Sequence, residues 1–166
     1  TFKELYDISS FLTMTGKFSG AINIGNNIIV FVPYNSKNVG IYDFEKNTFR
    51  LKSSAGLNLD GSNTVQDSQF SGGVLINDIV FFSPYNSKNK NSSGIIYRSV
   101  GAYNILTDKY LWADLDLDSE NIQYDIPIAI DKKIYFISKN SNKLGIFDTE
   151  NLIYNDSGYL QGVSYT

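Results

Sequence analysis

Histidine and cysteine are both absent from the 166 residues, and their absence excludes several classes of chemistry. The chain holds no Ser-His-Asp or Cys-His catalytic group, no imidazole or thiolate ligand for zinc or for iron–sulfur clusters, no haem-binding histidine and no disulfide. Acid–base chemistry would have to use Asp, Glu, Lys or Tyr, and a metal ion would need oxygen ligands. We therefore expect a protein that uses no cofactor.

Excess positive charge and long apolar runs are missing as well. Lys and Arg number 14 against 17 Asp and Glu, a net charge of −3, so nucleic acid and anionic membranes are not expected partners. No stretch approaches the roughly 18 consecutive apolar residues that span a bilayer, so we expect a soluble chain without membrane insertion. Zero cysteines suit a reducing cytosol, which we slightly favour, and suit a secreted protein with a large core, so the compartment stays open.

What is present is the composition of a folded protein, 42% hydrophobic and 14% aromatic, arranged in three copies of one unit. The copies begin at Phe18, Phe70 and Tyr124, and an asparagine common to all three recurs at spacings of 51 and 54 residues. A repeat of this length predicts an architecture assembled from similar supersecondary units.

Each unit is expected to form four β-strands. The first strand is short and rich in small residues, as at Gly20–Ile22, which suits a strand crowded near an axis. After a polar turn, the second is an uninterrupted apolar run, as at Ile28–Val32, which indicates burial of both faces. The third ends in an aromatic followed by Asp or Asn, as at Tyr42-Asp43, and another aromatic, here Phe49, stands six residues beyond. This spacing predicts a hairpin into a fourth, outer strand.

The aromatic–Asp/Asn pair, the polar turn and the outer aromatic resemble the second half of a kelch repeat. The stretches that carry the resemblance are residues 42–49, 103–110 and 147–154. The repeat period is also close to the roughly 50 residues of kelch blades. Where kelch repeats have a glycine pair after the second strand, this chain has Pro33-Tyr34, Pro84-Tyr85 and Ser138-Lys139, and Phe or Tyr replaces the usual outer tryptophan. The resemblance implies a β-propeller that serves as a rigid platform for protein partners.

The predicted fold is therefore an all-β protein, a β-propeller of which about three four-stranded blades are visible. Residues 1–17 are assigned to the outer strand of a preceding blade and a linker, and the blades with their linkers to 18–69, 70–123 and 124–166. Closed propellers hold about 4 to 8 blades. We expect either part of a larger propeller or half of a dimeric six-bladed ring, with the remaining blades supplied by the same chain or by a second copy.

The loops after each second strand and the linkers between units should share one face, and this loop-rich face is the candidate binding surface. Further candidates come from an insertion in the second unit, residues 90–99, which contains residue types enriched at interface hot spots. The candidate binding residues are Tyr34, Asn35, Lys37, Tyr85, Asn86, Lys88, Tyr97, Arg98, Asn140 and Lys143. Because the same loop motif recurs between units, these residues could equally serve to close the turns, and the insertion could be a longer hairpin.

Residues 114–125 alternate carboxylates with other residues and resemble an EF-hand calcium loop. Ser119 stands where that loop needs glycine, Asn121 replaces an apolar residue, and Asp125 is shorter than the usual bidentate Glu. Because no flanking helix is expected, the alternation fits the end of an outer strand better, and we expect no metal site.

The function that we predict is a non-enzymatic protein-interaction platform acting through the loop-rich face. The alternative is a glycan-binding or sugar-processing propeller, which would use Tyr and Asn on the same face and Trp112 as a stacking surface unless Trp112 packs between blades. An enzyme would need carboxylates that converge near the axis, whereas the first strands carry only Asn23 as a polar group. We therefore do not expect an enzyme.

Overall fold

The computed structural model describes most of the chain, and every regular element in the described part is a β-strand. The described residues are 7–53, 69–86, 88–90, 96–114, 123–140, 142, 144–150, 153–154 and 160–161. Within them, no helix is long and apolar enough to cross a membrane. The all-β class predicted from the sequence is confirmed.

The first sheet is an antiparallel meander whose four strands follow chain order. Its strands are β1 (Phe18–Asn23), β2 (Ile28–Pro33), β3 (Asn38–Asp43) and β4 (Thr48–Ser53). Asn26 and Asn27 turn the chain between β1 and β2 with φ of 49° and 58°, and Asn47 turns it between β3 and β4 with φ of 51°. Asparagine tolerates this left-handed conformation, which explains the polar turns of the sequence.

The second sheet repeats this order and adds one short strand. Its strands are β5 (Phe70–Ile76), β6 (Ile79–Pro84), β8 (Ile96–Asn104) and β9 (Lys109–Asp114), and β7 (Lys88–Lys90) pairs with the first residues of β8. Asn77 and Asp108 turn the chain with φ of 52° each. The second sheet is therefore built by the same turn chemistry as the first.

The third sheet has three strands in the described residues instead of the predicted four. It contains β10 (Ile128–Ile130), β11 (Lys133–Ile137) and β12 (Leu144–Asp148), whereas β13 (Ile153–Tyr154) pairs with β14 (Leu160–Gln161). Residues 151–152, between β12 and β13, lie outside the described residues.

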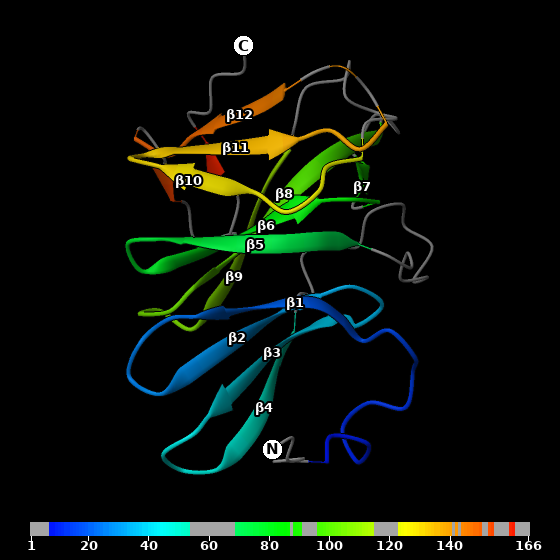
Figure 1. The fold of residues 1–166 in the computed structure, drawn as a ribbon, viewed down its shortest axis with the longest axis vertical. Helices are drawn as coiled ribbons and strands as arrows, with labels where there is room; N and C mark the ends of the chain where they lie inside the picture. Colours follow the sequence, from blue (N-terminus) through cyan, green and yellow to red (C-terminus); the bar gives the residue numbers. More distant parts are fainter. Residues whose placement is uncertain are drawn as a thin grey trace.

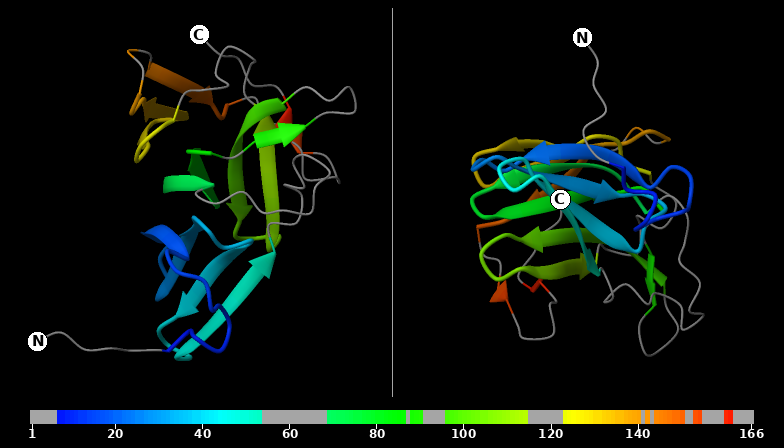
Figure 2. Two further views of the ribbon diagram at one scale, coloured as in Figure 1. Left: turned by 90° about the vertical axis from the view of Figure 1, so that its right-hand side faces the viewer. Right: turned by 90° about the horizontal axis from the view of Figure 1, so that it is seen from below.

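The three sheets are stacked face to face in chain order, with the first at the bottom and the third at the top of Figure 1. We call the face that meets the next sheet along the chain the leading face of a sheet, and the opposite one its trailing face. A side view keeps the same succession (Figure 2). The second sheet is therefore covered on both faces, whereas within the described residues the first and third are each stacked against the second sheet alone.

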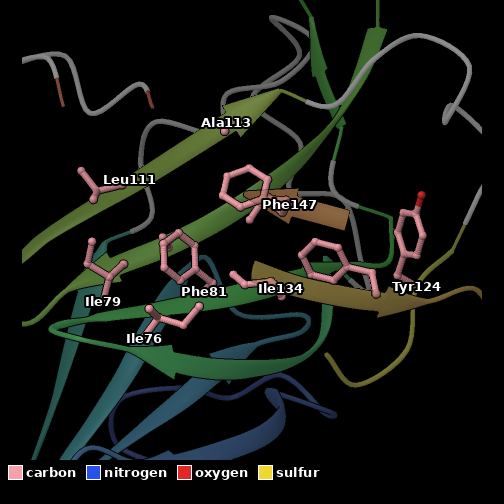
Figure 3. Packing of buried hydrophobic residues seen from close by; sticks show 11 residues of the cluster. Ile76, Ile79, Phe81, Leu111, Ala113, Tyr124, Ile134 and Phe147 are labelled. Atoms are coloured by element: carbon pink, nitrogen blue, oxygen red, sulfur yellow. The ribbon is translucent and has the colours of Figure 1, made fainter. Parts of the chain in front are cut away.

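Apolar side chains fill both junctions. The first junction contains Val30, Val32, Val39 and Ile41 of the first sheet with Phe70, Val80, Phe82, Tyr103 and Tyr110 of the second. The second junction contains Ile76, Ile79, Phe81, Val100, Ala102, Leu111 and Ala113 of the second sheet with Tyr124, Ile134, Phe136 and Phe147 of the third (Figure 3). These residues form the core of the described part of the chain.

The expected burial of both faces of the second strands is confirmed for one unit only. All six residues of β6 are buried. In β2, buried Val30 and Val32 alternate with half-buried Ile29 and Phe31, and β11 also alternates. Both-face burial requires a sheet on each side, and only β6 has one on each side in the described residues.

Candidate functional site

The linkers and the loops after the second strands meet at one end of the sheets. In each unit, the backbone carbonyl of the last linker residue accepts a hydrogen bond from the backbone N–H of the second loop residue. The pairs are Lys17 O with Tyr34 N at 3.0 Å, Gln69 O with Tyr85 N at 2.9 Å, and Gln123 O with Lys139 N at 2.8 Å. We call this end of the stack the loop end.

The tight turns lie at the opposite end, on the left of Figure 1. There a backbone hydrogen bond of 2.8 Å joins the two turns of each unit. The donors and acceptors are Phe44 N to Asn27 O, Ile105 N to Asp78 O and Thr149 N to Lys132 O. The separation of loops from turns that the sequence predicts is thus present in the described residues.

Three equivalent loop residues form a row across the loop end. The ring centroids of Tyr34 and Tyr85 are 6.2 Å apart, and the Lys139 Nζ lies 5.2 Å from the centroid of the Tyr85 ring. Both tyrosines are half-buried and Lys139 is exposed. We call these three residues the loop row, and each comes from a different unit.

The three candidate asparagines make hydrogen bonds inside the chain. Asn35 Nδ2 donates to the Thr15 carbonyl at 3.0 Å. Asn86 Oδ1 accepts from the side-chain Nε2 of Gln123 at 3.0 Å, and Asn140 Oδ1 accepts from the backbone N–H of Gln123 at 2.8 Å. These contacts favour the turn-closing role that the sequence left open for Asn35, Asn86 and Asn140.

The other candidate residues are only partly placed. Lys37 is exposed, one residue before β3. Lys88 lies in β7 opposite Arg98 of β8, and Tyr97 lies opposite Asn89; this register is all that is described for them. Lys143 lies outside the described residues, as do residues 115–122 of the EF-hand-like stretch.

Sequence reasoning missed two loop-end residues, Lys139 and Gln123. Lys139 occupies the position of Tyr34 and Tyr85, so alignment of the three units contained the signal, although its residue type differs. Gln123 lies at the linker end, and its hydrogen bonds to Asn86 and Asn140 tie the loops of the second and third units together. No motif in the sequence marked this bridge.

Charged residues cluster at the turn end, between the first two sheets. Arg50 Nη1 and Lys52 Nζ of β4 lie 2.9 Å and 3.1 Å from the carboxylate of Asp108, and the Tyr103 hydroxyl donates to the same carboxylate at 2.6 Å. Burial raises the pKa of Asp108, but the hydrogen bonds from Tyr103, Arg50 and Lys52 outweigh it and lower this pKa to about 2. This group joins two sheets, so its role is structural.

A shallow hollow of about 290 Å³ also lies at the turn end. Its lining includes Asn23, Asn27, Ile29 and Phe44. None of the candidate binding residues lines it. In the described residues, no three Asp or Glu side chains gather into a group that could hold a metal ion.

Comparisons with known proteins assign no family. No family model matches the chain, and no curated protein matches it. Among solved structures, the computationally designed Ika4 protein is 13% identical with a TM-score of 0.47, and the alignment covers 76% of this chain and 62% of that one. The N-terminal domain of Nup159, and a complex of S. cerevisiae Dbp5 bound to Nup159, Gle1, IP6 and ADP, are each 8% identical with a TM-score of 0.45. The alignments cover 89% of this chain but only 36% of those chains.

Proposed function

We propose that the three sheets are successive blades of a kelch-like β-propeller, and that the protein is a non-enzymatic platform that binds a protein partner through its loop end. The observation that carries this function is the loop row. Three separate units contribute Tyr34, Tyr85 and Lys139 to one continuous strip at that end.

The contacts between first strands support a propeller. The Ser19 hydroxyl of β1 donates to the Phe70 carbonyl of β5 at 2.7 Å, and the Ser71 hydroxyl donates to the Tyr124 carbonyl at 2.6 Å. A Cβ added at Gly72 would lie 3.2 Å from the Ile126 Cα, so these segments approach almost to backbone contact. Such crowding of equivalent strands is expected where blades converge on an axis.

The chemistry of the loop row favours a protein partner. Half-buried tyrosines present an apolar ring with a polar hydroxyl, and tyrosine is enriched at interface hot spots because it loses little conformational entropy. A lysine beside the rings adds a cation for an acidic group of the partner. The intrachain bonds of Asn35, Asn86 and Asn140 would hold this strip in shape before the partner binds.

Two observations weigh against the glycan alternative. Trp112 of β9 is partly buried and packs against the core cluster between the first two sheets. Lys139 also lies over the Tyr85 ring, so that ring face is not open for a sugar to stack on.

A binding comparison tests the proposal. Affinity capture with the wild-type chain identifies the bound proteins, and each is then titrated against purified Tyr85→Ala and Lys139→Ala variants. We expect at least a tenfold loss of affinity in both variants and no change for Leu106→Ala, a control at the turn end whose side chain is 75% exposed. Unchanged affinity in both loop-row variants would refute the assignment, and binding on a glycan array that depends on Tyr85 would favour the alternative.

A further inference from the structure

The two internal junctions follow one chemical rule. At the first, the aliphatic leading face of the first sheet, with Val30 and Ile41, meets a trailing face that carries Phe70, Phe82 and Tyr110. At the second, a leading face that is aliphatic apart from Phe81 meets aromatic residues on the trailing face of the third sheet (Figure 3). Each trailing face is thus marked by large rings, which bury the most apolar area per residue.

The leading face of the third sheet is likewise aliphatic apart from one ring, Tyr135, and in the described part of the chain much of it is exposed. Ile128, Ile130, Ile137 and Leu144 are 51–55% exposed. The register pairs Ile137 with Leu144, which places the two on one face, and Ile128 and Ile130 alternate along β10 toward that same face. The position equivalent to Ile130 in the second sheet is Ile76, which is only 8% exposed beneath the third sheet.

The trailing face of the first sheet carries the complementary rings. The ring centroids of Phe18 and Phe31 are 5.5 Å apart, and those of Phe31 and Phe49 are 6.1 Å apart. Phe49 is already buried, with the Phe11 ring at a centroid distance of 5.5 Å, whereas Phe31 is half-buried and its neighbour Ala21 is exposed. Phe18, Phe31 and Phe49 occupy the positions at which Phe70, Phe82 and Tyr110 fill the first internal junction.

We propose that a second copy of the chain docks on the leading face of the third sheet through the trailing face of its own first sheet. The two ends of the stack are the two halves of one junction type, so the contact is head to tail and continues an interface that already exists twice within the chain. Two such contacts close a pair of chains. This inference rests on the stacking of the sheets and is independent of what binds at the loop end.

The contact between copies differs from the internal junctions in its polar groups. At the second junction, Ser71 and Ser83 each donate a hydroxyl to a backbone carbonyl of the third sheet at 2.6 Å, and Gly72 allows close approach. The third sheet has Asp125, Ile137 and Ile126 at these positions. Neither Asp125 nor Ile137 has a hydroxyl to donate there, so we expect burial of apolar area to dominate the contact with the second copy and the association to be reversible.

Sedimentation equilibrium of the whole chain tests the proposal, over about 1 µM to about 1 mM because apolar contacts of this kind give moderate affinities. We expect the average mass of the wild-type protein to rise with concentration toward that of two chains. Ile128→Lys on the leading face and Ala21→Arg on the trailing face should each weaken association at least tenfold, and Leu106→Lys at the turn end should not. Ile130→Lys provides a second leading-face variant, and circular dichroism checks that each one folds.

A mixture of two weakened variants identifies the geometry. The Ile128→Lys chain retains an intact trailing face and the Ala21→Arg chain retains an intact leading face, so an equimolar mixture should associate more strongly than either variant alone. A single mass of one chain at all concentrations would overturn the proposal, as would association that Leu106→Lys weakens equally. A mixture that associates no more strongly than either variant alone would exclude a head-to-tail contact.

Discussion

Arg50 of β4 and Asp108 of the turn between β8 and β9 form an ion pair of 2.9 Å across the first junction, although 58 positions separate them in the chain. The Tyr103 hydroxyl bonds to both partners, at 3.1 Å from Arg50 and 2.6 Å from Asp108. The pair therefore ties the outer strand of one sheet to the turn of the next.

Asp108 should contribute to stability in a way that depends on pH within a defined window. The pKa of Asp108 is lowered from 3.8 to about 2 in the folded chain, so its contribution is fully present above pH 3.8 and is lost as the pH falls through 2. Because the side chain is 47% exposed, solvent screening limits this contribution to about 1 kcal/mol. We expect Asp108→Asn to lower the free energy of unfolding by this amount at pH 7, measured by urea denaturation.

The same comparison near pH 2 provides the check. The difference between the wild type and Asp108→Asn should there be much smaller than at pH 7, because the native carboxyl is then about half protonated and the unfolded one almost fully so. Asparagine also suits the positive φ of 52°, since Asn47 occupies the equivalent turn with φ of 51°. A difference that stays constant between pH 7 and pH 2 would show that charge is not the cause.

Loss of the Ser71 hydroxyl should loosen the second junction. Ser71→Ala removes the 2.6 Å hydrogen bond to the Tyr124 carbonyl and leaves that acceptor without its donor. We expect a loss of about 1 kcal/mol in the free energy of unfolding. Ser9→Ala is the matched control, because the Ser9 hydroxyl is exposed and bonds only locally to Asp7. Equal effects of the two substitutions would contradict a role for Ser71 between sheets.

Two glycines should differ sharply in their tolerance of a methyl group. A Cβ at Gly101 would lie 2.6 Å from a ring carbon of Phe70 and would also overlap the Tyr110 hydroxyl, whereas at Gly20 the nearest atom is the Gly72 Cα at 4.0 Å. Overpacking of this kind costs about 1–3 kcal/mol. We expect such a loss for Gly101→Ala and a much smaller change for Gly20→Ala, measured by thermal unfolding. Comparable losses would argue against tight packing at Gly101.

The strand and turn positions were accessible from the sequence because they depend on local chemistry. The turns at Asn26-Asn27, Asn77 and Asp131 need left-handed backbone, and all four residues have positive φ. Likewise β3 and β8 end at Asp43 and Asn104, where the aromatic–Asp/Asn pairs placed them. Repetition of a local signal makes such predictions robust.

Burial and contacts that depend on neighbouring units were harder to predict from the sequence. Whether the second strand buries one face or two depends on which sheets lie beside it, and β2 and β6 have similar compositions but different surroundings. The loop row was missed in part because Lys139 differs in type from Tyr34 and Tyr85 although it shares their position. Contacts such as Gln123 to Asn86 join residues far apart in the chain and leave no local pattern.

Site-specific photocrosslinking tests the central claim, that the loop end contacts a protein partner, most directly. A photoreactive amino acid replaces Lys139 in one variant and Leu106, at the turn end, in the other, and each is irradiated with the protein that the wild-type chain captures. We predict a covalent adduct with the partner from position 139 and none from position 106. An adduct from position 106 with none from position 139 would contradict the assignment of the loop end as the binding surface.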